Sequence, residues 1–462
     1  MADKDDFISL VFASISFPRD SYSAIGDVLL FRPLTFCFLG LERFLFGYNF
    51  YLWQLTGILL HFGVVFSLGS LLWVIRPGMS AIMATGFFAL QLTNVSMVNW
   101  NQINPYLVFT ALLLWALREL YLFEQDAERR VVRVYITAIL MTIASLFYEG
   151  GVFYSVLMFL YLLWISRRQH SSLFVSAWML LPVIVYTGFD YWDISLRHFA
   201  FNAESGLIIN KLFSFETIFN AARTFKWFLC CGLFLAPADI IESVRTYVLP
   251  HTLTWQWPFI GFQPQMIRGV VIILTTLAIL RVGYSREYAK KQASFLLLLA
   301  VIMFTYVVVI VLGRVNPRGF INGLLVSSYY LYIFWALLTV FVYTMFDLSR
   351  CQRHSFWKTC RWLPVILIVL TAGVNTVYIR EVNAMILAGQ RETRIYINYV
   401  GAFVREHQSE KAFTFDIASG CPGSFPDWVA KEKQVGGGIA ESYYHRYIDH
   451  DHPRYHLMCP SY

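Results

Sequence analysis

The sequence has 462 residues, of which 58% are hydrophobic and 14% are charged, and its formal net charge is +7 at pH 7. This composition excludes an ordinary soluble domain, because such domains carry about 25% charged residues. Apolar windows of about twenty residues, long enough to cross a bilayer, recur from Tyr51 to Ile379. The net positive charge therefore reflects basic cytoplasmic loops. No basic run is interleaved with aromatic residues, so we expect no nucleic-acid partner.

The first segment, residues 1–50, is polar and acidic, and the hydrophobic part of the chain follows it. It begins MADKDDF and has neither the basic nor the apolar region of a signal peptide. Pro33 suits the first turn of a helix and Gly47 lies where that helix would stop, so we predict a short helix over 33–46. The few polar residues of this helix are Thr35, Glu42 and Arg43. We interpret them as a solvent-facing stripe on a helix that lies at the membrane surface.

Residues 51–380 are predicted to form one all-α polytopic domain with a GT-C-like helical bundle, as explained below. The apolar windows predict ten spans: 51–75, 79–95, 104–124, 132–148, 152–167, 171–191, 266–284, 292–313, 320–346 and 362–380. We interpret the apolar stretch 226–241 as re-entrant or surface-lying. The remaining residues, 381–462, are predicted to form a small external tail.

The distribution of lysine and arginine sets the predicted orientation. One alternating set of loops collects them, whereas the opposite short loops, 96–103 and 149–151, contain none. Because basic residues gather on the cytoplasmic side, residues 1–50 and the tail are expected outside. Ten spans with both ends outside require something to carry the N-terminus across. We therefore expect the complete protein to have another helix before Met1, eleven spans and a cytoplasmic N-terminus.

An ordered series of motifs covers roughly residues 3–165. It consists of Asp5-Asp6-Phe7, Phe31-Arg32-Pro33-Leu34, Leu41-Glu42-Arg43-Phe44-Leu45-Phe46-Gly47, Tyr51, Leu59-Leu60-His61, Asn94 to Trp100, Leu107 to Tyr121 and Leu146-Phe-Tyr-Glu149-Gly150. The series resembles the first external loop and following helices of GT-C type glycosyltransferases, especially bacterial relatives of the transmembrane and tetratricopeptide-repeat O-mannosyltransferases. Two features differ from that family. Tyr148 stands where a lysine is often found, and no tetratricopeptide array follows the last span.

The resemblance implies transfer of a sugar from a polyprenyl-phosphate carrier to a hydroxyl acceptor on the external face, with inversion. Such a reaction needs a carboxylate that takes the acceptor proton. Asp5 matches the first acid of the family pair and is our candidate base. Asp6 would orient the acceptor or help to hold a divalent cation; no other cofactor is expected. The tail contains a run of histidines and aspartates over residues 445–456, but its spacing matches no standard zinc site.

The leaving group would be a phosphate at the membrane surface, which calls for cationic donors. Arg314 and Arg318, in the motif Gly313-Arg-Val-Asn-Pro-Arg-Gly319, are the only lysine or arginine residues in the predicted short external loops. Arg318 could instead snorkel to the interface or cap a helix. Arg32 is a second candidate, although it could simply fix its loop to lipid headgroups. Glu149 would orient the acceptor or pair with an arginine. His61 is expected to be a neutral imidazole bonded to a neighbouring helix.

The sequence thus predicts a multi-pass glycosyltransferase of the bacterial inner membrane, with its site facing the periplasm or exterior. Its expected partners are a polyprenyl-phosphate-linked sugar, a hydroxyl-bearing acceptor and membrane lipids. Two alternatives stay open. The chain could be a transporter or lipid flippase, or a non-catalytic membrane scaffold.

Overall fold

The computed structural model describes residues 32–46, 50–90, 104–125, 130–169, 173–197, 221–222, 224–225, 228, 288–313 and 329–350. All regular elements in these ranges are helices, and the same ranges contain no strand. The all-α class is therefore confirmed for this part of the chain.

Five described helices are long and apolar enough to cross a membrane. They are α3 (Phe50–Ile75), α6 (Asn104–Gln125), α7 (Arg130–Phe147), α8 (Gly150–Gln169) and α15 (Tyr288–Gly313). They correspond to five of the predicted spans and are compatible with an integral multi-pass membrane protein. The predicted spans 266–284 and 362–380 lie outside the described residues.

Three further predicted spans contain shorter apolar helices. Residues 79–95 contain α4 (Met79–Ala89), and residues 320–346 contain part of α17 (Tyr329–Arg350). Residues 171–191 do not form one continuous α-helix, because the 3-10 turn η2 (Trp178–Leu180) separates α9 (Leu173–Ala177) from α10 (Leu181–Arg197). Sequence hydropathy does not register such a local change of helix type.

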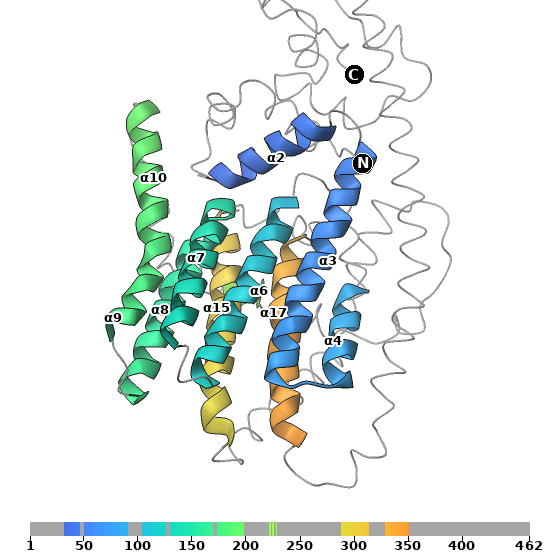
Figure 1. The fold of residues 1–462 in the computed structure, drawn as a ribbon, viewed down its shortest axis with the longest axis vertical. Coiled ribbons are helices and arrows are strands. Elements are labelled where there is room, and N and C mark those ends of the chain that lie inside the picture. The colour runs from blue at the N-terminus through green and yellow to red at the C-terminus, as the bar shows by residue number, and fades with distance from the viewer. Residues whose placement is uncertain are drawn as a thin grey trace, which may run out of the picture.

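The helices pack as a bundle. Helix α6 contacts α3 and α7, α8 contacts α7 and α15, and α17 contacts α15, α3 and α4. Figure 1 shows α15 and α17 behind the layer formed by α3, α6, α7 and α8. A short helix, α2 (Pro33–Phe46), lies across the ends of α3, α6 and α7 and contacts all three (Figure 1).

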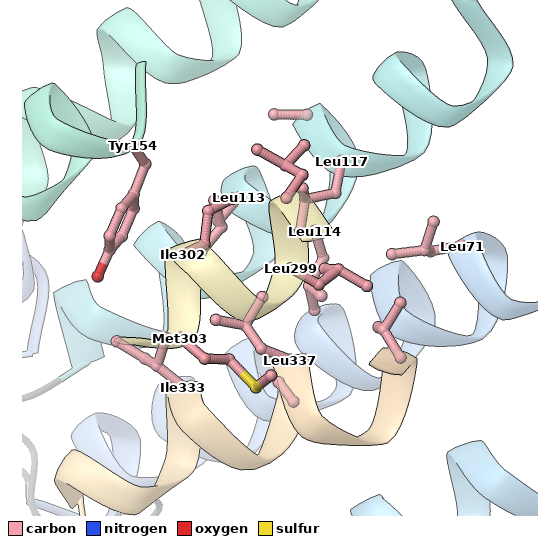
Figure 2. Packing of buried hydrophobic residues seen from close by; sticks show 14 of the residues in the cluster. Leu71, Leu113, Leu114, Leu117, Tyr154, Leu299, Ile302, Met303, Ile333 and Leu337 are labelled. Carbon is pink, nitrogen blue, oxygen red and sulfur yellow. The ribbon is translucent and has the colours of Figure 1, made fainter. Parts of the chain in front are cut away.

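The core of the bundle consists of leucines and other apolar side chains from helices that are distant in sequence. Figure 2 shows leucines of α6 facing α15 and α17. The labelled side chains are fully or almost fully buried: Leu71, Leu113, Leu114, Leu117, Tyr154, Leu299, Ile302, Met303, Ile333 and Leu337. Between membrane helices the alternative to such burial is lipid and not water, so close van der Waals packing of this cluster helps to hold the two helix layers together.

Helix α3 is apolar on two sides. Val64, Leu68 and Leu72 face the core with no exposed surface, whereas Leu59 and Phe66 are 60% and 69% exposed. A helix that is hydrophobic all round belongs in a membrane or in the core of a large protein. The exposed side of α3 therefore offers a lipid-facing surface.

The helix predicted over 33–46 is confirmed, since α2 has those bounds. The prediction of a solvent-facing polar stripe is wrong. Thr35 and Glu42 are 8% and 3% exposed, whereas Phe44 is 85% exposed and Leu41 and Leu45 are also exposed. Periodicity identifies the polar residues of a helix but does not say what lies against them, and here Thr35 and Glu42 face polar partners on the bundle.

Candidate functional site

The candidate site lies where the start of α2 meets the turn between α7 and α8. The described part of the chain brings together two of the six predicted site residues, Arg32 and Glu149. The predicted catalytic acids Asp5 and Asp6 and the predicted phosphate-binding residues Arg314 and Arg318 lie outside the described residues.

Arg32 and Glu149 form a bidentate ion pair across 117 positions of sequence. The Nε of Arg32 donates a hydrogen bond of 2.6 Å to Oε2 of Glu149, and Nη2 donates one of 2.6 Å to Oε1. The two side chains are 16% and 20% exposed. Parallel hydrogen bonds between a guanidinium and a carboxylate fix orientation as well as distance, so this pair sets how α2 enters the bundle.

Two tyrosines complete the surroundings of the guanidinium. The Nη1 of Arg32 donates a hydrogen bond of 2.8 Å to the hydroxyl of Tyr106. The guanidinium carbon lies 5.0 Å from the ring centroid of Tyr148 and 5.5 Å from that of Tyr106. Both distances are within the range of cation–π attraction. Tyr106 was not singled out from the sequence, because a tyrosine near the start of an apolar span carries no distinctive signal.

Local backbone geometry explains why these groups meet. Arg32 precedes Pro33, the first residue of α2, and its carbonyl accepts a hydrogen bond of 3.1 Å from the amide of Thr35. Glu149 directly precedes α8, and its carbonyl accepts a hydrogen bond of 3.0 Å from the amide of Val152. The Glu149 carboxylate thus stands at the N-terminal, positive end of the α8 dipole.

The turn between α7 and α8 has no room for side chains at its two glycines. A Cβ on Gly150 would lie 2.5 Å from the Tyr148 ring, and a Cβ on Gly151 would lie 2.8 Å from the backbone of Ser145. Both distances are shorter than real Cβ contacts. The turn therefore depends on glycine for close packing and holds Glu149 on a tightly packed support.

Two more polar contacts tie α2 to the bundle. The hydroxyl of Thr35 donates a hydrogen bond of 2.7 Å to the carbonyl of Phe147. The Nδ2 of Asn104, a residue with no exposed surface, donates a hydrogen bond of 2.8 Å to Oε1 of Glu42. Asn104 was likewise not identified from the sequence as a partner.

The electrostatics of the cluster favour the charged form of Arg32 and the neutral form of Tyr148. Burial alone lowers the pKa of Arg32, but the Tyr106 phenol and the Glu149 carboxylate outweigh it and hold that pKa well above its usual value. Burial, helped by the nearby Glu149 carboxylate, raises the pKa of the Tyr148 phenol well above its usual value. The Tyr148 phenol therefore stays protonated at physiological pH.

His61 lies deeper in the bundle and is not part of this cluster. Its Nδ1 is 2.7 Å from the hydroxyl of Tyr332 on α17, and its Nε2 is 3.3 Å from the carbonyl of Ala89 at the end of α4. The predicted bond to a neighbouring helix is confirmed. Since a carbonyl only accepts, Nε2 carries the proton in this arrangement and Nδ1 accepts from the phenol.

Among the residues that the structure describes, no group of three or more His, Cys, Asp or Glu side chains could hold a metal ion. Comparison of the chain with protein-family models, with curated proteins and with solved structures finds no match.

Proposed function

We propose that the chain is a membrane glycosyltransferase that moves a sugar from a polyprenyl-phosphate carrier to a hydroxyl acceptor on the external face. One observation carries the proposal: motifs that make up the GT-C resemblance meet at one end of the bundle. The Arg32-Pro33 motif contacts the Tyr148-Glu149 motif, and the Glu42 motif contacts the start of α6. Two motifs of the series are thus in direct contact, and a third docks beside them on the bundle.

The charge distribution along α7 supports the proposed orientation. Arg133, near the start of α7, and Glu149, just past its end, are about 24 Å apart at 1.5 Å per residue. Basic loops face the cytoplasm, so the loop that precedes Arg133 is assigned to the cytoplasmic side. The candidate site then lies on the external side, as a periplasmic enzyme of the bacterial inner membrane requires.

In the proposed reaction, the Asp5 carboxylate takes the proton of the acceptor hydroxyl as its oxygen attacks the anomeric carbon. The bond between that carbon and the carrier phosphate breaks, and the electron pair leaves with the phosphate. Arg314 and Arg318 would stabilise the charge on the departing phosphate. Asp6 would orient the acceptor or help to hold a divalent cation.

The experiment measures transfer of label from radioactive undecaprenyl-phosphate mannose and undecaprenyl-phosphate glucose in membranes of cells that produce the full chain. Protein, lipid and polysaccharide fractions are counted separately, because the acceptor is not specified by the site. Asp5→Asn is expected to lower transfer about 10²–10⁴-fold, the range for loss of a general base. Asp3→Asn, in the same acidic stretch, is the matched control.

Transfer that Asp5→Asn leaves unchanged would remove the proposed base. In sealed vesicles, label that crosses the membrane without joining an acceptor would instead support the transporter or flippase alternative. If the label is neither transferred nor carried across the membrane, the scaffold alternative is favoured.

A further inference from the structure

Arg32 has two conceivable tasks in the proposed enzyme: to bind the donor phosphate, or to hold other groups in place. The contacts described above discriminate between them. We infer that Arg32 is a positioning residue and that its pair with Glu149 is a latch that fixes α2 onto the ends of α6 and α7 and the turn before α8. The inference rests on the proposed function only in its statement that Arg32 does not bind the phosphate of the sugar donor.

The first argument is that every nitrogen of the guanidinium is already engaged. Nε and Nη2 donate to the two oxygens of Glu149, and Nη1 donates to Tyr106. The guanidinium lies over the rings of Tyr106 and Tyr148. A phosphate that used the Nε and Nη2 edge of Arg32 would have to displace Glu149, which would leave a carboxylate beside an anion.

The second argument concerns charge. Arg32 and Glu149 together carry no net charge, so the pair offers little long-range attraction to a phosphate. Their side chains are only 16% and 20% exposed, and separating a mostly buried pair leaves an uncompensated charge in a poorly hydrated place. A neutral, mostly buried pair suits a fixed contact better than a site that exchanges ligands.

The third argument is that other residues on the same side of α2 also contact the bundle. Arg32, Thr35, Phe38 and Glu42 recur at intervals of three or four residues, which places them on one side of the helix. Thr35 and Glu42 bond to the bundle, and the Phe38 ring packs edge-on against Phe147 with centroids 6.3 Å apart. Arg32 is thus the first of a row of residues that dock α2.

The fourth argument is the stiffness of the support. Glu149 sits beside Gly150 and Gly151, where the close approach of Tyr148 and Ser145 leaves no space for a Cβ. A carboxylate on such a turn has little freedom to follow a moving partner. The latch therefore fixes the position of residue 32, from which the segment bearing Asp5 and Asp6 extends.

The test combines hydrogen exchange of α2 with transfer kinetics, on the full chain in nanodiscs. Arg32→Gln is expected to speed exchange of residues 33–46 about tenfold, since a lost latch worth about 1.4 kcal/mol changes the open population by that factor. Arg32→Lys keeps the charge but loses the bidentate hydrogen bonding, so it should give a hydrogen-exchange rate of α2 between those of wild type and Arg32→Gln. The double variant Arg32→Glu/Glu149→Arg should return the exchange toward wild type. Arg167→Gln, at an exposed arginine at the other end of α8, is the control.

Kinetics separate positioning from phosphate binding. For the latch, Arg32→Gln lowers kcat while the KM for undecaprenyl-phosphate mannose or glucose stays within about twofold of wild type. A KM that rises more than about tenfold, with α2 exchange unchanged, would show direct contact with the donor and overturn the inference. Unchanged exchange in Arg32→Gln would overturn it as well.

The two proposals fail separately. If wild-type chain transfers no sugar but Arg32→Gln still releases α2, the glycosyltransferase assignment is wrong and the latch stands. If transfer depends on Asp5 but the hydrogen-exchange rate of α2 is the same in wild type and Arg32→Gln, the glycosyltransferase assignment stands and the latch is wrong.

Discussion

Arg133 of α7 donates a hydrogen bond of 2.7 Å to Glu119 of α6, and the same carboxylate also accepts one from Arg118. Glu119 is 8% exposed, while Arg118 and Arg133 are 24% and 15% exposed. One carboxylate thus serves two guanidinium groups where α6 and α7 meet, at the opposite end of α7 from the latch.

Glu119→Gln is expected to destabilise the bundle by about 2 kcal/mol. Removing one partner of a buried ion pair costs about 3–5 kcal/mol, and the partial exposure of both arginines reduces that cost. The free energy of unfolding, measured by SDS titration in bicelles, checks this value. Gln125→Ala, at an exposed position of the same helix, should change it by less than about 0.5 kcal/mol.

Tyr332→Phe is expected to lower the free energy of unfolding by about 0.5–1.5 kcal/mol, because Nδ1 of His61 loses the phenol that lies 2.7 Å away. Tyr51→Phe is the control, because that residue is 69% exposed. Equal stability of the Tyr332→Phe and Tyr51→Phe variants would show that the buried hydrogen bond contributes nothing net.

Gly150→Ala is expected to destabilise the protein by about 1–3 kcal/mol, because the added Cβ would lie 2.5 Å from the Tyr148 ring. Gly63→Ala is a sharp contrast, since nothing lies within 4 Å of its Cβ position. That substitution should be neutral or stabilise α3 by about 0.5–1 kcal/mol. Thermal unfolding of the two variants in one detergent gives the comparison, and a Gly150→Ala variant as stable as wild type would contradict it.

Thr35→Val removes the hydrogen bond of 2.7 Å from Thr35 to the carbonyl of Phe147 while keeping a similar volume. We expect a loss of about 1 kcal/mol, together with faster hydrogen exchange confined to α2. The matched control is Thr56→Val, whose hydroxyl bonds only within its own helix, to the carbonyl of Leu52 among the described contacts. Exchange that rises equally across all helices would indicate general loosening instead of local release of α2.

Local signals in the sequence predict individual helices well. Pro33 and Gly47 give the bounds of α2, and the apolar run from residue 51 to 75 matches α3 within one residue. These predictions succeed because helix ends and lipid-length apolar runs depend on nearby residues.

Contacts between distant segments are harder to predict. The sequence predicts that Glu149 orients an acceptor or pairs with an arginine, but it does not say that Arg32 is that arginine. Nor does it reveal that Glu42 turns inward, because its partner Asn104 is 62 positions away. Only packing of α2 against α6 and α7 brings these groups together, and hydrophobic periodicity contains no information on which helices become neighbours.

The inward-facing polar residues of α2 have a consequence for biosynthesis. Arg32 leaves the ribosome 117 residues ahead of Glu149, and Glu42 leaves it well before Asn104. Until the later helices have been inserted, the charged groups of this early segment must stay with water or lipid headgroups. Helix α2 therefore takes its final place only after the chain has been translated beyond the turn that follows α7.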